Sequence, residues 1–233
     1  MGVEQKIAIL TYQSRHRKTY DTLCLLKAKG YQTVSVYASP LHYKKKFKPL
    51  FEHRPGIMEE MPSTKELCHN FGYTYIEGKL EELEIPSDNI VLICGAGILS
   101  DAFVASHVII NSHPGYLPNC RGLDAYKWAI YKGEPIGVTS HFLGTEIDTG
   151  KLINRKRIEI EEGDTFHTVA GKVYENEIYL LVSAIEVQKD SYLELPSEGY
   201  PVHKRMPREC EEELLMLFEK RKKTEIKKRR GEI

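Results

Sequence analysis

The amino-acid sequence predicts an α/β protein. We expect a Rossmann-like, three-layer arrangement, in which helices cover both faces of a mostly parallel sheet and a small helical extension follows. Short runs such as Ile7–Leu10 and Ile90–Ile93 are apolar throughout, as strands of a parallel sheet are when both of their faces are buried. Helical segments separate these runs, which is the pattern of βαβ units with right-handed crossovers. We place the main domain at residues 1–190 and the extension at residues 191–233.

The first half of the chain is expected to supply the parallel strands. Gly30 has the position of a C-cap glycine that ends the first helix. Ser63 and Glu66 have the spacing of a capping box, which predicts that another helix begins there and runs to about Gly72. The predicted strands are residues 6–12, 33–37, 73–76, 89–94 and 108–110.

The second half predicts longer helices. We expect Asp164 to cap a long helix over residues 165–188, and the turn-rich segment 196–207 to precede an amphipathic helix over 209–223. The basic residues 227–230 are expected to be a frayed, solvated tail, with RNA or membrane binding as the alternative. The remaining predictions are a helix at 123–131 and strands at 138–143 and 151–160.

Charge and composition exclude several classes of protein. Lys+Arg and Asp+Glu both number 33, so no global field favours nucleic acid. The five cysteines form no CxxC pair and are expected to be reduced thiols, not zinc ligands or disulfides. No apolar run approaches the roughly 18 residues needed to cross a bilayer, and the N-terminus does not resemble a signal peptide. We therefore expect a cytoplasmic protein without metal, membrane or nucleic-acid partner.

The first strand-to-helix turn carries no G-x-G-x-x-G pattern, which argues against a nicotinamide enzyme. Ser14 and Arg15 in this turn are candidates for contact with a substrate phosphate, and a solvated basic turn is the alternative. The basic segment 41–61 is either a loop that touches an anionic substrate or an ordinary connection.

The stretch Asn111–Pro118 combines polar side chains with strand-breaking residues. Asn111 and His113 alternate at the end of an apolar strand, so both side chains leave the same face. Open α/β sheets bind ligands at the carboxyl ends of their strands. An amide and an imidazole side by side at this edge indicate a site.

At these residues the chain resembles the folate-dependent formyltransferases, which include the glycinamide ribonucleotide, methionyl-tRNA and sugar-nucleotide enzymes. The resemblance covers residues 88–153 and is carried by Asn-x-His-Pro-Gly-x-Leu-Pro, by Arg121-Gly122, by Gly-Val-Thr-x-His ending at His141, and by Ile-Asp-Thr-Gly ending at Gly150. It implies a formyltransferase fold, a 10-formyltetrahydrofolate cosubstrate without a metal, and a homodimer.

The resemblance also assigns roles, and each has a plainer alternative. Asn111 and His113 would stabilise the formyl oxygen, and Asp148 would keep His113 protonated or take up the amine proton. The alternatives are turn, capping and packing residues. The residues expected to contact folate are Gly95, Gly97, Ile98, Leu99, His141, Ile147 and Gly150. The residues expected to contact the other substrate are Ser14, Arg15, Gly115, Tyr116, Arg121 and Gly122. Residues 95–100 otherwise form a plain turn capped by Ser100 or Asp101, and His141 is otherwise a core histidine.

The expected acceptor is the amine of an amino-deoxy sugar carried on a nucleoside diphosphate. The segment after Gly150 is too short for the additional domain of the methionyl-tRNA enzymes, and the Gly-rich phosphate loop of the purine enzymes is missing. Residues 121–125 are similar to the sugar-nucleotide branch. A purine-pathway formyltransferase, a formyltetrahydrofolate hydrolase and a non-catalytic folate- or nucleotide-binding module are the alternatives.

Overall fold

The computed structural model describes residues 5–41, 48–52, 54–56 and 60–232, and much of the basic segment 41–61 lies outside these residues. The chain divides into two compact units. The described parts of unit 1 are residues 5–41, 55–56, 60–111 and 181–188. The described parts of unit 2 are residues 48–52, 54, 112–180 and 189–232.

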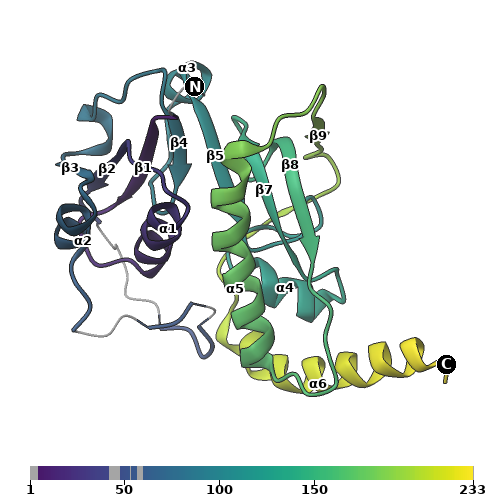
Figure 1. The fold of residues 1–233 in the computed structure, drawn as a ribbon. Coiled ribbons are helices and arrows are strands. Elements are labelled where there is room, and N and C mark those ends of the chain that lie inside the picture. The colour runs from purple at the N-terminus through teal and green to yellow at the C-terminus, as the bar shows by residue number, and fades with distance from the viewer. Residues whose placement is uncertain (1–4, 42–47, 53, 57–59, 233) are drawn as a thin grey trace. The chain divides into compact units, whose positions relative to one another are not determined.

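Unit 1 contains a parallel sheet with the strand order β3-β2-β1-β4-β5 (Figure 1). Its central strand is fully buried, and Ile9 pairs with Val36 on one side and Leu92 on the other. The apolar runs therefore form strands as predicted. The elements are β1 (Ile7–Tyr12), α1 (Arg17–Ala28), β2 (Val34–Ser39), α2 (Thr64–Phe71), β3 (Thr74–Glu77), the short 3-10 helix η1 (Leu80–Glu82), β4 (Ile90–Ile93), α3 (Asp101–Ser106) and β5 (Val108–His113).

The helix ends in unit 1 follow local sequence signals. Ser63 Oγ accepts from Glu66 N at 3.2 Å, and Glu66 Oε2 accepts from Ser63 N at 2.7 Å, so the predicted capping box is confirmed. Gly72 ends the same helix in the left-handed conformation that glycine favours. Ser100 caps α3 by accepting from Phe103 N at 3.3 Å.

Unit 2 adds three antiparallel strands, β7-β8-β9, and a small parallel pair, β6 and β10. Within the described residues the main sheet holds eight strands, which confirms the predicted α/β class with a mostly parallel sheet. The elements are β6 (Arg121–Gly122), α4 (Ala125–Lys132), β7 (Gly137–Leu143), β8 (Gly150–Arg157), α5 (Phe166–Ser183), the 3-10 helix η2 (Ala184–Glu186), β9 (Leu193–Leu195), β10 (Val202–His203) and α6 (Arg208–Arg230).

The long helix α5 begins differently from the prediction. Thr165 is the capping residue, because its Oγ1 accepts from Thr168 N at 3.1 Å. The expected cap, Asp164, instead closes the preceding turn by accepting from Glu161 N at 2.7 Å. The prediction was wrong by one residue because Asp164 and Thr165 are both good capping residues and only the backbone path decides between them.

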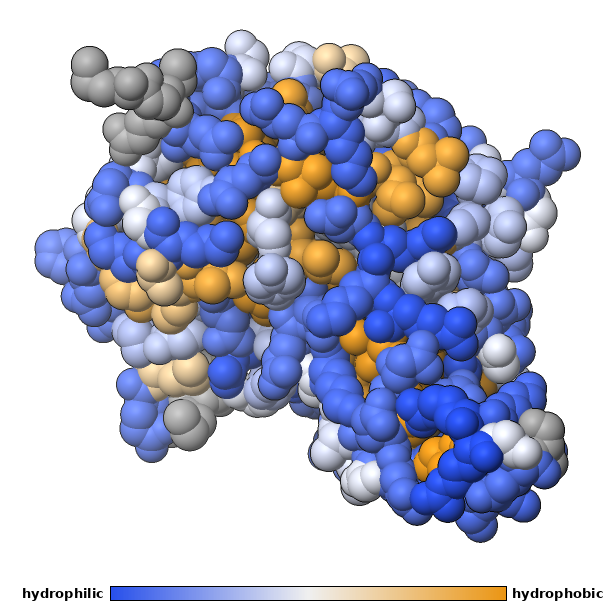
Figure 2. Space-filling view, turned by 45° about the vertical axis from the view of Figure 1, so that its right-hand side comes forward, coloured by the Kyte–Doolittle hydropathy of each residue, from blue (hydrophilic) through white to orange (hydrophobic). Residues whose placement is uncertain are grey.

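The last helix is longer than the sequence predicted, and the expectation of a frayed tail was wrong. Arg229 Nη1 donates to Glu161 at 3.2 Å, and Arg230 Nη2 donates to Glu162 at 2.7 Å. These acidic partners are distant in sequence, so the helical pattern alone could not reveal them. Figure 2 shows the surface of α6, at the lower right, as mostly hydrophilic.

Helices α4 and α6 close the apolar core of unit 2. Met206, Leu214 and Phe218 from the extension are buried against Tyr126 and Ala129. Within this core, Lys127 Nζ donates to Glu211 Oε1, and both side chains are 2% exposed. A buried charge of this kind requires its partner, so α6 is fixed to α4 by an ion pair as well as by apolar contact.

We find no described helix that combines the length and the apolar character needed to cross a membrane.

Candidate functional site

His113 lies at the end of β5, and both of its ring nitrogens face oxygen atoms. Nε2 is 2.8 Å from the carbonyl oxygen of Cys120, and Nδ1 is 3.3 Å from Oδ1 of Asp148. The ring is buried, with 5% of its side-chain surface exposed. The two predicted residues His113 and Asp148 are therefore brought together.

Asp148 is held in an uncommon backbone conformation. Its φ of 51° is left-handed, a region that Asp and Asn enter more readily than most residues. Its Oδ2 accepts a 2.7 Å hydrogen bond from Gly122 N, which leaves Oδ1 facing the imidazole. The side chain is 12% exposed, so the carboxylate is largely shielded but still accessible.

Both oxygen atoms that face the His113 ring are hydrogen-bond acceptors. A carbonyl oxygen only accepts, so Nε2 carries a hydrogen toward Cys120. Nδ1 faces Oδ1 of Asp148, which also accepts hydrogen bonds. The site therefore places an imidazole beside a carboxylate, an arrangement that can stabilise an oxyanion.

His141, another of the predicted site residues, contacts the loop that carries Asp148, and its imidazole remains neutral. It is fully buried on β7, and its Nδ1 donates to the carbonyl oxygen of Thr149 at 2.8 Å. Burial lowers its pKa to about 4, against the opposing effect of the Asp148 carboxylate. The hydrogen bond fixes the peptide that follows Asp148, so this ring supports the loop.

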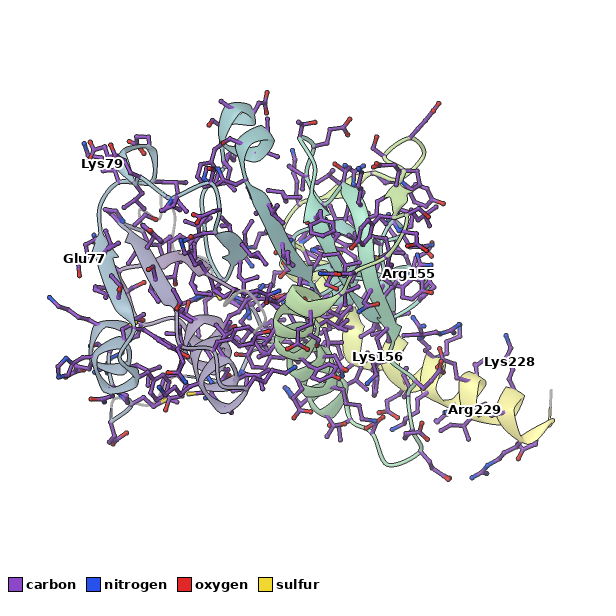
Figure 3. All side chains as sticks on the ribbon, turned by 45° about the horizontal axis from the view of Figure 1, so that its top comes forward. Glu77, Lys79, Arg155, Lys156, Lys228 and Arg229 are labelled. Carbon is purple, nitrogen blue, oxygen red and sulfur yellow. The ribbon has the colours of Figure 1, made fainter. Side chains whose placement is uncertain are left out.

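The turn after His113 is held to β7 by Thr139. The Thr139 hydroxyl donates to Gly115 O at 2.9 Å and accepts from Leu117 N at 3.0 Å. A Cβ added at Gly115 would lie 2.6 Å from Nε2 of His113, so only glycine leaves room for the imidazole. Arg155 on β8, labelled in Figure 3, lies 4.2 Å over the ring of the predicted residue Tyr116.

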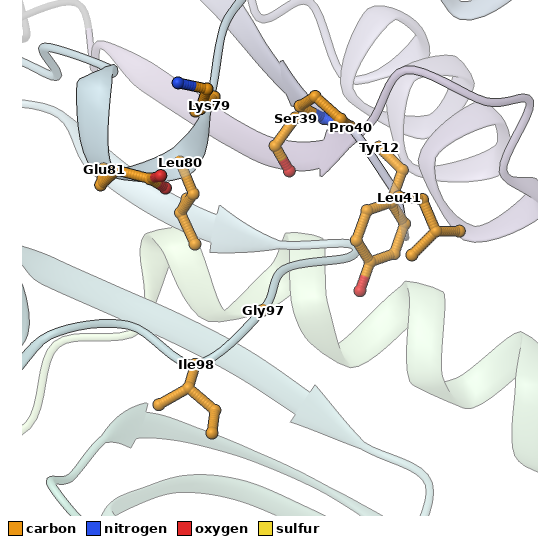
Figure 4. Close-up of a pocket in the computed structure, with 9 residues that line it drawn as sticks. All are labelled: Tyr12, Ser39, Pro40, Leu41, Lys79, Leu80, Glu81, Gly97 and Ile98. Atoms are coloured by element: carbon orange, nitrogen blue, oxygen red, sulfur yellow. The ribbon is translucent and has the colours of Figure 1, made fainter. Parts of the chain in front are cut away.

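Unit 1 presents the predicted folate segment beside a cavity. Tyr12 Oη donates to Ala96 O at 2.9 Å, and a Cβ added at Gly95 would lie 2.5 Å from the Tyr12 ring. The cavity holds about 390 Å³. Its lining residues are Tyr12, Ser39, Pro40, Leu41, Lys79, Leu80, Glu81, Gly97 and Ile98 (Figure 4).

A second cavity of about 210 Å³ adjoins the same segment and shares the lining residues Leu80, Glu81 and Ile98 with the first. Ile98 and Leu99 line it together with Ile85 and Phe103. Ile98 is 97% exposed, which is unusual for a large apolar side chain. An exposed isoleucine between two cavities is suited to contact an aromatic ring.

The other predicted residues occupy less distinctive positions. Asn111 is half-buried on β5, two residues before His113. Ser14 and Arg15 are exposed in the turn after β1, and neither lines the two cavities described above. Ile147 is exposed, and Gly150 has a φ of 104° that favours glycine.

Sequence reasoning missed several participants. The carbonyl of Cys120 acts through the backbone, so no side-chain pattern identifies it. Gly122 was predicted as a substrate contact, but the bond of its amide to Asp148 was not. Thr139 belongs to the Gly-Val-Thr-x-His motif quoted above, so its hydroxyl group could have been recognised from the sequence as a candidate site group. Among the described residues, no group of three or more His, Cys, Asp or Glu side chains is arranged to hold a metal ion.

Comparison with known proteins identifies the central part of the chain. Residues 73–185 match the model of the family described as formyl transferase. The chain is 32% identical over 117 residues to the trifunctional purine biosynthetic protein adenosine-3 of Gallus gallus, which covers 48% of this chain and 12% of that protein. It is 31% identical over 102 residues to the phosphoribosylglycinamide formyltransferase of Bacillus subtilis, which covers 42% of this chain and 52% of the relative. The chain thus spans about half of the length of these relatives or less.

A solved sugar 3N-formyl transferase, crystallised with dTDP and 5-N-formyl-THF, has a similar fold. The TM-score is 0.61 at 15% sequence identity, and the match covers 88% of this chain and 71% of that chain.

Proposed function

We propose that the protein transfers a formyl group from 10-formyltetrahydrofolate to an amine of a nucleotide-linked amino-deoxy sugar. The match of residues 73–185 to the formyl transferase model supports the proposal. The observation that carries the proposal is the contact of 3.3 Å between His113 Nδ1 and Asp148 Oδ1. Both groups are oriented by backbone partners, so they need no reorganisation before reaction.

The reaction joins the amine nitrogen to the formyl carbon and breaks the bond from that carbon to the folate nitrogen. The amine must lose a proton, and the folate nitrogen must gain one. Asp148 receives the amine proton, directly or through water, and passes it to the folate nitrogen as the bond from the formyl carbon to that nitrogen breaks. The N–H at Nδ1 of His113 and the amide of Asn111 donate to the formyl oxygen as negative charge develops on it. Nε2 of His113 is committed to the Cys120 carbonyl. Nδ1 faces the Asp148 carboxylate, so its hydrogen turns from that carboxylate to the formyl oxygen as Asp148 takes up the amine proton.

The segment Gly95–Leu99 is proposed to contact the folate ring. The exposed Ile98, the apolar lining from Leu99 and Phe103, and the absence of a side chain at Gly97 suit a flat aromatic group. His141, Ile147 and Gly150 lie in or beside the Asp148 loop and are proposed to contact the cosubstrate.

The acceptor is proposed from two considerations. The solved sugar 3N-formyl transferase of similar fold was crystallised with dTDP, and its fold covers most of this chain. The turn after β1 also lacks the glycines of a phosphate loop and instead exposes Ser14 and Arg15, which are proposed to contact a diphosphate. Gly115, Tyr116 and Gly122 are proposed as further contacts of the acceptor. The purine acceptor glycinamide ribonucleotide is the second candidate, because the relatives most similar in sequence include purine enzymes.

We further propose that residues 1–190 form the catalytic domain, that residues 191–233 are its extension, and that two copies associate. Light scattering on the purified protein tests the dimer.

The decisive assay combines purified protein, 10-formyltetrahydrofolate and a panel of amino sugars linked to dTDP, GDP or UDP. Tetrahydrofolate release and the mass of the product are measured, with a His113→Ala variant as control. We expect formylation of at least one sugar and loss of turnover in the variant. Turnover of glycinamide ribonucleotide alone would reject the sugar acceptor, and formate release without any acceptor would indicate a hydrolase.

A further inference from the structure

Arg121 is a buried arginine whose donors are directed to the backbone. Its Nε and Nη2 donate to the carbonyl oxygen of Ile147 at 3.0 and 2.7 Å. Its Nη1 donates to the carbonyl oxygens of Ser197 and Tyr200 at 3.2 and 3.0 Å. The residue is 3% exposed, so these bonds form in a largely water-free environment.

The guanidinium has no donor left for a substrate. It carries five N–H groups, and four of them make the hydrogen bonds to backbone carbonyls. The remaining hydrogen, on Nη2, lies on the side of Glu146, whose Oε2 is 3.5 Å from that nitrogen. From the sequence we expected Arg121 to contact the acceptor. In the structure its hydrogen bonds hold the loop that carries Asp148.

The loop needs this support because Asp148 occupies a strained backbone region. A left-handed residue persists when its surroundings determine its position by several contacts. Arg121 holds the carbonyl before Asp148, the Gly122 amide holds its carboxylate, and His141 holds the carbonyl of Thr149 after it.

We infer that Arg121 is a positioning residue that sets the orientation of Asp148 toward His113 and couples it to the segment 197–200 of the C-terminal extension. One planar guanidinium connects the two segments, because its fork reaches carbonyls in both at once. Lysine has a single nitrogen and cannot reproduce this pattern. The expected effect on catalysis rests on the proposed function, whereas the effect on the His113–Asp148 contact does not.

The test compares Arg121→Lys with the matched control Arg221→Lys. Arg221 also belongs to unit 2, and its Nη1 donates to the backbone carbonyls of Ala129 and Glu134 at 3.0 and 2.7 Å. The control therefore disturbs two hydrogen bonds to backbone carbonyls and the contact of Nε with Glu225, none of which involves the Asp148 loop. Thermal unfolding confirms that each variant is folded at the temperature of the assay.

The first readout is the imidazole NMR spectrum of histidine-labelled protein, with the His113 signal assigned from a His113→Gln variant. We expect the His113 ring signals to shift in Arg121→Lys and to stay in place in Arg221→Lys. This measurement requires no substrate, so it decides the positioning role even if no acceptor is turned over. Unchanged His113 signals in a folded Arg121→Lys protein would overturn the inference.

The second readout is kinetic. A displacement of about 1 Å in a catalytic group costs roughly 100-fold in rate, so we expect kcat of Arg121→Lys to fall by that order, with KM for the acceptor within about twofold. The pH dependence of kcat should also change, because the charge pair is disturbed. A raised KM with normal kcat would instead make Arg121 a substrate ligand and would overturn the inference.

Discussion

The substitution Asp148→Asn removes the negative charge of this side chain but keeps its size and shape. Asparagine tolerates the left-handed backbone at this position. Its side-chain oxygen can accept from Gly122 N, as Oδ2 does at 2.7 Å, and its amide group then faces Nδ1 of His113. An amide donates, so Nδ1 must accept, and the ring carries its hydrogen on Nε2 toward Cys120. The variant therefore keeps the hydrogen bond to the Gly122 amide and loses the carboxylate charge beside His113.

The magnitudes follow from the two contacts that change. A hydrogen bond to a charged group contributes about 1.5–3 kcal/mol, and a neutral one about 0.5–1.5 kcal/mol, so the stability cost of Asp148→Asn is about 1–2 kcal/mol. The loss of a positioned base and of a charged donor lowers kcat by roughly 10²- to 10⁴-fold. That range corresponds to about 3–5 kcal/mol of activation free energy. The catalytic effect should thus exceed the structural one.

Single-turnover measurements at saturating cosubstrate, read by tetrahydrofolate formation, give the chemical step directly. Urea unfolding gives the stability change. Asp148→Ala is the companion variant, because it also leaves the Gly122 amide without its acceptor and should lose about 1–3 kcal/mol in stability. The proposed role of Asp148 is refuted if Asp148→Asn retains more than about a tenth of the wild-type rate.

Three further predictions concern stability. Burial lowers the pKa of His141 to about 4, whereas the unfolded chain binds a proton at this residue below about pH 6.5. The free energy of unfolding should therefore fall by up to about 3 kcal/mol as the pH decreases from 6.5 to 4. Urea unfolding at several pH values should show a smaller fall for His141→Gln. Lys127→Met leaves the buried Glu211 carboxylate with the Leu50 amide as its donor and should lower the free energy of unfolding by about 3–5 kcal/mol. Adding Glu211→Leu should restore most of that stability. Equal stabilities of the single and double variants would contradict this. Gly150→Ala places a Cβ 2.1 Å from a carbonyl oxygen and should cost about 2–6 kcal/mol by urea unfolding, while Gly171→Ala, which meets no atom within 4 Å, should be neutral or stabilising.

The parallel strands could be predicted from the sequence because their signal is local. A strand such as Ile7–Tyr12 is buried on both faces, so its apolar run identifies it without knowledge of its neighbours. The observed ends of these strands differ from the predicted ones by at most three residues. β10, with only two residues, was not predicted, because it forms by pairing with Arg121–Gly122 and has no pattern of its own.

The meeting of His113 and Asp148 was expected from the resemblance and not from spacing. No periodicity relates a strand end to a distant loop, and the structure brings the two side chains together through β7 and the turn that follows it. The partners that orient them are backbone atoms of Cys120 and Gly122. Backbone atoms are the same in every sequence, so their roles become visible only with coordinates. The catalytic roles themselves stay predictions.

The buried pair between Lys127 and Glu211 has a practical consequence for anyone who shortens this chain. Cutting after residue 190 removes Glu211 and leaves the buried ammonium group of Lys127 with the more distant Asp124 Oδ1, at 3.8 Å, as its acidic neighbour. It also uncovers the apolar side chains that Met206 and Phe218 now shield, inviting aggregation during expression. Trimmed versions should therefore keep α6, and a fusion tag belongs beyond its exposed final turn, where the labelled side chains of Lys228 and Arg229 project from the helix (Figure 3).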